Sequence, residues 1–164
     1  MNDPGNMPIT KLWDTVNLSS DFVASMQTAC GPMILGAAPS PKNPLNDLPF
    51  MFCEHFGGNT QALAVIVSAW NLLRKAARIL DDFEDGDVAP SDHHGLLLNT
   101  STGLIFTASL ALNYLECESC QPDVASDIRQ KFYEILLQTC NGQHNDLLAE
   151  RPTLEERGRI VEEK

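Results

Sequence analysis

The sequence has little positive charge, and its middle has none. Lysine and arginine number 11 against 22 aspartate and glutamate residues, so the net charge is −11. No lysine or arginine falls between residues 79 and 128. A chain this acidic repels nucleic acid and anionic membranes unless a metal ion intervenes. We therefore expect no nucleic acid among its partners.

Long apolar runs, an even set of cysteines and strand patterns are also lacking. The longest apolar run, residues 62–69, is too short to span a bilayer, so no transmembrane segment is expected. The N-terminus carries no signal-peptide pattern, and the five cysteines are odd in number, which favours a reducing cytoplasm. No segment alternates apolar and polar residues as a half-buried strand does. These absences predict a cytoplasmic, all-α protein.

Glycine and proline divide the chain into helices and connections. Residues 1–17 predict a loose N-terminal tail, with Trp13 packed on the body, and residues 18–164 predict one helical domain. The prolines in residues 36–49 predict a connection without secondary structure. Helices are expected at about 19–31, 48–56, 60–85 and 96–115, from Asp123 towards Pro152, and from the capping box at Thr153 onward. Because its residues leave almost no polar face, the helix at 60–85 is expected to be the longest and most buried.

That helix runs into five carboxylates between Asp81 and Asp87. A helix C-terminus carries partial negative charge, so each acid there costs about 0.3–1 kcal/mol and favours a bound cation. Asp81 and Asp85 are four residues apart and share a helix face, while Asp82 lies about 100° round the axis. Mg²⁺ typically takes one or two carboxylates and completes its shell with phosphate and water. The pattern predicts a magnesium site at Asp81, Asp82 and Asp85.

Two other interpretations of the acidic stretch remain open. It is also typical of a solvated acidic turn in which Arg78 pairs with Asp82. A calcium loop beginning at Asp81 is the other alternative, although Phe83 in its third position has no oxygen and Asp92 replaces the glutamate of its twelfth.

Three stretches, in this order, resemble motifs of the trans-isoprenyl diphosphate synthases, also called polyprenyl synthetases. Residues 81–85 resemble the first aspartate-rich motif, Asp-Asp-x-x-Asp, and residues 142–147 resemble the Gly-Gln-x-x-Asp-Leu motif. Residues 153–164 are similar to the segment that leads to the family's Lys-Thr. Gly57-Gly58 is similar to the Gly-Gly that opens an earlier substrate motif. The resemblance covers about residues 48–164.

The resemblance implies a helical bundle around a deep cavity, like half of an isoprenoid synthase domain. Members of the family condense an allylic diphosphate with isopentenyl diphosphate, using Mg²⁺ bound by aspartate-rich motifs. By resemblance, the metal ligands and catalytic residues are Asp81, Asp82 and Asp85, joined near the diphosphate by Gln143 and Asp146. Lys164 is implied to contact the prenyl diphosphate, and Ala76 and Ala77 to form a small-residue floor that leaves room for long prenyl tails.

Departures from the family pattern limit this expectation. The family's Gly-Gly-Lys-Arg is Gly57-Gly58-Asn59-Thr60 here, residues 89–95 hold no arginine, and no second aspartate-rich motif is present. We expect a polyprenyl synthase-like chain that corresponds to the N-terminal half of the family domain and is catalytically impaired. The alternatives are a non-catalytic synthase-derived subunit and an acidic, cation-binding helical interaction protein. An exposed cavity wall also predicts a homo-oligomer, most simply a dimer.

Overall fold

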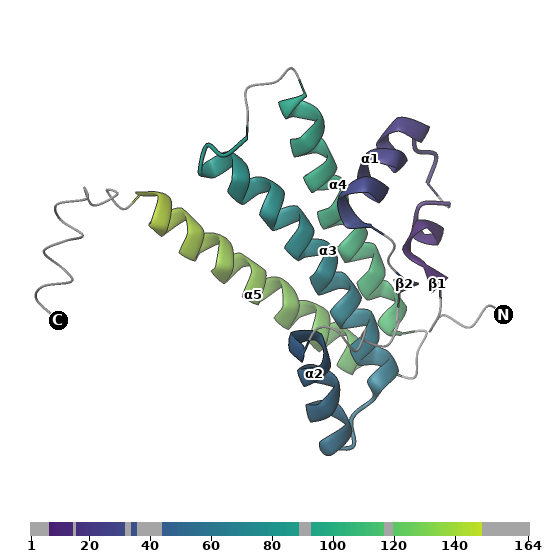
Figure 1. Cartoon of the computed structure of the whole chain (residues 1–164). Helices are drawn as coiled ribbons and strands as arrows, with labels where there is room; N and C mark the ends of the chain where they lie inside the picture. Colours follow the sequence, from purple (N-terminus) through teal and green to yellow (C-terminus); the bar gives the residue numbers. More distant parts are fainter. Residues whose placement is uncertain are drawn as a thin grey trace, which may run out of the picture. The chain divides into compact units, whose positions relative to one another are not determined.

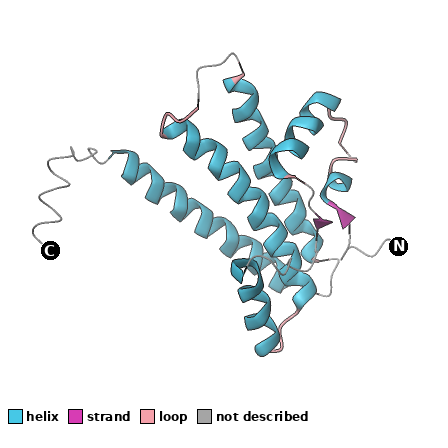
Figure 2. Cartoon of the chain, viewed as in Figure 1, coloured by secondary structure: helices cyan, strands magenta, loops and turns pink. Residues whose placement is uncertain are grey.

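The computed structural model describes residues 7–14, 16–31, 34–35, 44–88, 93–116 and 120–148, and this part of the chain is all-α, as the sequence predicts (Figures 1 and 2). One two-residue antiparallel strand pair, which the sequence does not signal, places Met7 opposite Leu35. The elements in order are β1 (Met7–Pro8), η2 (Ile9–Leu12), α1 (Ser20–Cys30), β2 (Ile34–Leu35), α2 (Pro44–His55), α3 (Thr60–Glu84), α4 (His94–Leu112), η3 (Asn113–Leu115) and α5 (Pro122–Leu148).

The chain divides into two compact units, Met1–Ser126 and Asp127–Lys164. The boundary falls inside α5, within the residues 18–164 that the sequence assigns to one helical domain. The described part of the second unit is the remainder of α5, which carries an exposed ion pair of 2.8 Å between Lys131 and Glu134. All other described elements belong to the first unit.

Local capping residues set the ends of α1 and α3 where the sequence predicts them. The Ser19 hydroxyl accepts a hydrogen bond from the backbone N–H of Phe22, and Gly31, at φ 68°, ends α1. The Asn59 side chain accepts from the backbone N–H of Gln61 and so begins α3. These boundaries follow from hydrogen bonds between near neighbours, which sequence patterns report well.

The first unit is built on α3 and α4, which run side by side in opposite directions (Figure 1). Leu72 of α3 and Leu104 and Leu112 of α4 are fully buried in this core. The expectation that α3 is the longest helix and apolar all round is wrong. α5 has 27 residues against 25 for α3, and α3 keeps an exposed side with Trp70, Arg74, Lys75 and Arg78.

The helix α4 is apolar although it contains many hydroxyl groups. Thr100 and Thr107 donate hydrogen bonds to carbonyl oxygens four residues earlier in α4. Satisfied in this way, the hydroxyls are accepted in an apolar setting. As a result, His94–Leu115 is long and apolar enough to cross a membrane by length and composition, and 39% of its most apolar stretch is buried in the structure. The core helix of a soluble protein meets the same criteria. Threonine, serine and asparagine interrupt the apolar residues of this segment, so a search for uninterrupted apolar runs does not find it.

The expectation of a loose N-terminal tail fails for residues 9–13. Residues 9–13, predicted to lie in a loose tail, form η2 and its following turn, and Ile9, Leu12 and Trp13 are buried. Of the predicted tail contacts, the packing of Trp13 is confirmed. The apolar side chains of η2 face the body every third or fourth residue, a pattern too short to recognise beside Pro4, Gly5 and Pro8.

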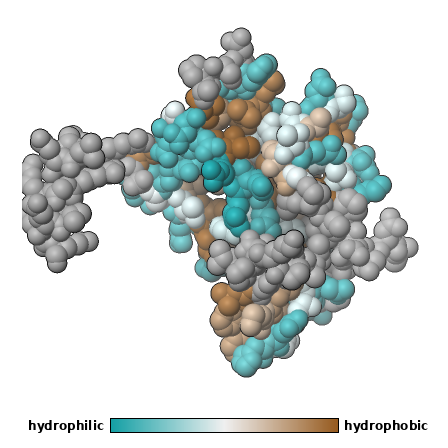
Figure 3. All heavy atoms as spheres, viewed as in Figure 1, coloured by the Kyte–Doolittle hydropathy of each residue, from teal (hydrophilic) through white to brown (hydrophobic). Residues whose placement is uncertain are grey.

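The helix α2 begins within the stretch that was predicted to be a connection. It starts at Pro44 and continues through Pro49. Proline fits the first helical position because its missing N–H would be unpaired there, and Pro49 removes only one bond of a short helix. Figure 3 shows hydrophobic surface over the α2 region, where Met51 and Phe52 are more than half exposed.

Candidate functional site

The acidic stretch forms the C-terminal end of α3. Asp81 is exposed and Asp82 half-buried in the last turn, and Asp85 is the exposed C-cap residue. Gly86 follows at φ 75°, and its N–H bonds to the carbonyl of Phe83 at 3.2 Å. The N–H of Asp87 reaches the carbonyl of Asp82 at 2.9 Å, which completes a Schellman motif. Because the Asp85 N–H also bonds to the carbonyl of Asp81 at 2.9 Å, helical spacing holds from Asp81 to Asp85.

The structure brings two of the three predicted metal ligands onto one face. Asp81 and Asp85 share that face, whereas Asp82 points about 100° away and is partly buried. Among the described side chains, no three His, Cys, Asp or Glu residues lie close enough to hold a metal ion. The predicted convergence of all three carboxylates is therefore absent from this conformation, because a single helical turn spreads them around its axis. The pair alone still meets the need of a Mg²⁺ ion that draws its other ligands from phosphate and water.

The first alternative, a solvated acidic turn, agrees with the exposure of Asp81, Glu84, Asp85 and Asp87 in the structure. Within the described region, no ion pair joins Arg78 to Asp82. A calcium loop beginning at Asp81 is wrong, because residues 81–84 are helical. His94, which follows in the chain, packs its ring edge-on against Phe83, with centroids 5.2 Å apart. This contact joins the end of α3 to the start of α4.

The two small residues predicted to floor a tail cavity face different surroundings. Ala76 is buried at 1% exposure, and its carbonyl oxygen accepts a 3.0 Å hydrogen bond from the Ser101 hydroxyl of α4. It therefore lies in the contact between α3 and α4. Ala77, one residue on, is exposed.

The remaining predicted site residues all belong to the second unit. Gln143, half-buried, and Asp146 lie on α5 within the second unit, and α3 belongs to the first. Lys164 lies outside the described residues.

Gly57-Gly58 has a local structural role. Gly57, at φ 67°, ends α2 in a second Schellman motif, in which the N–H of Gly58 bonds to the carbonyl of Cys53 at 2.7 Å. A Cβ on Gly58 would lie 2.6 Å from the Cys53 sulfur. Helix termination and close packing therefore account for both glycines without a substrate.

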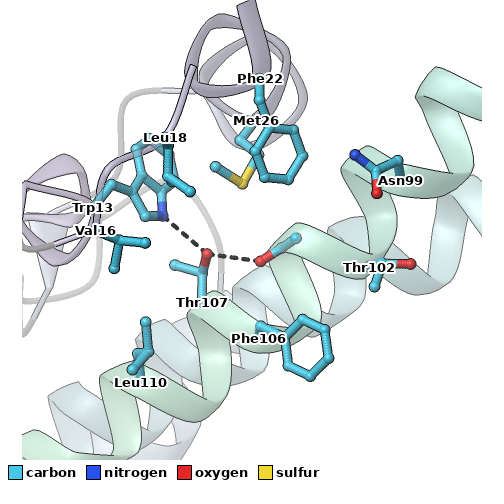
Figure 4. Close-up of a pocket in the computed structure, with 11 residues that line it drawn as sticks. Trp13, Val16, Leu18, Phe22, Met26, Asn99, Thr102, Phe106, Thr107 and Leu110 are labelled. Atoms are coloured by element: carbon cyan, nitrogen blue, oxygen red, sulfur yellow. Dashed lines mark hydrogen bonds between the residues drawn. The ribbon is translucent and has the colours of Figure 1, made fainter. Parts of the chain in front are cut away.

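A pocket that the sequence did not predict lies between α1, α4 and the segment after η2 (Figure 4). Its volume is about 290 Å³. The indole Nε1–H of Trp13 donates a 2.9 Å hydrogen bond to the Thr107 hydroxyl beside it. Gly103 allows α1 to approach, since a Cβ there would lie 2.5 Å from Phe22. The sequence features that could have indicated this pocket are Trp13 within the expected tail and Gly103 within an apolar helix.

The site geometry described above can be compared with that of known proteins. No protein-family model, curated protein or solved structure matches it. The resemblance to trans-isoprenyl diphosphate synthases therefore rests on the motifs alone, and the function that follows from it is a proposal.

Proposed function

We propose that this chain is a polyprenyl synthase-like protein that binds Mg²⁺ together with a diphosphate group at the C-terminal end of α3, without efficient catalysis by itself. The observation that carries the proposal is the exposed pair Asp81 and Asp85, held on one face by a capped helix end. A helix C-terminus repels further negative charge, so a bound cation relieves the repulsion.

The proposed ligand set matches the chemistry of Mg²⁺ with diphosphate. Two carboxylates bind the ion, and the diphosphate oxygens and water complete an octahedral shell. In the family that the motifs resemble, such metal ions neutralise the charge that develops on the leaving diphosphate. The cations that would bind a second diphosphate are replaced by Asn59 and Thr60 here, so we propose weak binding and little turnover.

Calorimetric titration with inorganic diphosphate, with and without Mg²⁺, tests the proposal. We expect binding only in the presence of Mg²⁺ and its loss in the double variant Asp81→Asn/Asp85→Asn. The matched control, Asp21→Asn/Glu54→Gln, removes the same charge from exposed positions elsewhere and should bind like the wild type. Undiminished binding by the first variant would place the site elsewhere.

A titration with Mg²⁺, with and without diphosphate, distinguishes the second candidate function, an acidic cation-binding interaction protein. That function predicts Mg²⁺ binding that requires Asp81 and Asp85 but does not change when diphosphate is added. The exposed apolar residues of α2 suit contact with another protein and so favour this second function.

A further inference from the structure

The pocket between α1 and α4 has a mostly apolar wall. Two polar groups on this wall, the Trp13 indole N–H and the Thr107 hydroxyl, already take part in hydrogen bonds. The Thr107 hydroxyl accepts from Trp13 and donates to the carbonyl of Gly103 at 2.7 Å. Neither polar side chain therefore has a donor left for a ligand. Phe22 and Met26 of α1 pack on α4 at Gly103, and the exposed ring of Phe106 lies on α4 at the edge of the pocket (Figure 4).

One end of the pocket is polar and the other is apolar. Asn99 and Thr102 lie at one end of the row of lining residues on α4, and Leu110 lies at the other (Figure 4). The structure gives the Asn99 side chain no hydrogen-bond partner within the described protein, so its amide is available to a ligand. Asn99 and Leu110 are eleven positions apart on α4, which corresponds to about 16 Å at 1.5 Å per residue.

Size and charge narrow the class of ligand. A volume of about 290 Å³ equals that of roughly ten waters at about 30 Å³ each. This suits a molecule of about ten non-hydrogen atoms and is too small for a docked helix. None of the eleven lining residues is charged. An ionised group would therefore find no counter-charge among the lining residues, and an anion would also meet a chain of net charge −11.

We propose that this pocket binds an uncharged, elongated apolar molecule with one terminal hydroxyl, such as a medium-chain alcohol. The chain lies along α4 between Phe22 and Phe106, and the hydroxyl bonds to the Asn99 amide. This site is separate from the proposed diphosphate site and does not depend on it, because none of the acidic residues of α3 lines the pocket.

Fluorescence of Trp13 provides a direct measurement with 1-decanol as the probe. Trp70 is the second of two tryptophans and is exposed on α3, so Trp70→Phe leaves Trp13 as the reporter. In this background we expect a saturable change in emission with 1-decanol. Decanoate, which has the same chain length and a negative charge, should bind more weakly, because no lining residue offers a counter-charge.

Three variants locate the binding. Thr102→Phe, at an exposed lining position, should fill the opening and weaken decanol binding at least about tenfold. Leu98→Phe, one turn earlier on α4 and outside the pocket, should leave it unchanged. Asn99→Ala keeps the pocket but removes the polar partner and should weaken binding about three- to tenfold. Circular dichroism confirms that each variant is folded.

Three results would overturn the proposal. The first is the absence of a saturable decanol signal in the folded Trp70→Phe protein. The second is equal binding by Thr102→Phe and Leu98→Phe, which would place the ligand elsewhere. The third is a signal that follows protein self-association in light scattering, which would show that a second copy of the chain fills the pocket.

Discussion

The hydroxyl of Ser101 donates a 3.0 Å hydrogen bond to the backbone carbonyl oxygen of Ala76, and both residues are almost completely buried. This bond links α4 to α3 across the core of the first unit. It requires the two backbones to approach closely, which the small side chains at these positions allow. Ala76, which the family resemblance assigns to a substrate cavity, therefore helps to hold two helices together.

Removing the Ser101 hydroxyl should weaken the α3–α4 contact. Ser101→Ala loses one hydrogen bond but leaves the Ala76 carbonyl inside a helix, so we expect the free energy of unfolding to fall by about 0.5–1.5 kcal/mol. The neighbouring variant Thr102→Ala is the control, because Thr102 is exposed and bonds only within α4. Urea denaturation measures both, and an equal loss in the two variants would contradict the assigned role.

The orientation of α3 predicts different effects on stability when Ala76 and Ala77 are each replaced by phenylalanine. Ala76→Phe forces a ring into the α3–α4 contact and should destabilise the protein by about 1–3 kcal/mol or prevent folding. Ala77→Phe lies on the exposed side and should change stability by less than about 0.5 kcal/mol. Thermal unfolding of both decides the matter. If a prenyl tail binds along α3 as the resemblance implies, Ala77→Phe should also shift its preference towards short tails in competition binding.

Close packing at Gly103 gives a further contrast within α4. A Cβ there would meet the ends of Phe22 and Met26 at 2.5 and 2.8 Å, so these side chains must move. Overpacking typically costs about 1–3 kcal/mol, and the better helix propensity of alanine returns up to about 1. We expect Gly103→Ala to lower stability, whereas Gly95→Ala, which meets no atom within 4 Å, should raise it. Melting temperatures that rise in both variants would show that α1 does not pack as described.

Sequence patterns predicted the features that depend on near neighbours. The caps at Ser19 and Asn59 and the stop at Gly86 all rest on hydrogen bonds spanning a few residues, and each helix that they bound was expected. The all-α class followed from the same local patterns. The packing of Trp13 on the body was expected, but its partner was not, because no local pattern encodes which distant residues meet. Trp13 and Thr107 are 94 residues apart, and their bond defines one wall of the pocket.

The acidic site shows the same limit in a different form. Spacing correctly placed Asp81 and Asp85 on one helix face, since that depends only on helical geometry. It could not bring Asp82 to the same point, because helical rotation carries that side chain away. That Gln143 and Asp146 lie near these aspartates stays a prediction of the family resemblance, because both residues belong to the second unit.

Burial of Cys30 predicts a slow thiol. Burial raises the pKa of Cys30 above its ordinary value of 9.0, and its own backbone hydrogen bond and Lys75 oppose the rise only in part. Since the thiolate is the reactive form, iodoacetamide should alkylate Cys30 at least about tenfold more slowly than the exposed Cys140. Mass spectrometry after timed alkylation reads each site. Similar rates in the folded chain, and not only after denaturation, would contradict the buried position.

The same raised pKa has a consequence for stability at high pH. The folded chain holds the Cys30 proton more tightly than the unfolded chain does. This contribution to stability is therefore fully present below pH 9.0 and is lost as the pH rises through the raised value. Cys30→Ala should remove that part of the alkaline decline, which urea denaturation across this pH range would detect.

The exposed apolar surface of α2 and its C-terminal cap predicts self-association. Phe52 and Phe56 are 56% and 78% exposed, and an apolar group of this kind usually marks an interface. We expect a concentration-dependent dimer by light scattering, since two-fold pairs are the commonest closed assembly. Phe52→Ser/Phe56→Ser should shift it to monomer, because each buried aromatic ring contributes about 1.5–3 kcal/mol to such a contact. Leu96→Ser/Leu98→Ser, also exposed but on α4, is the matched control and should leave the dimer intact. If the α4 control dissociates the dimer and the α2 variant does not, α4 forms the interface instead.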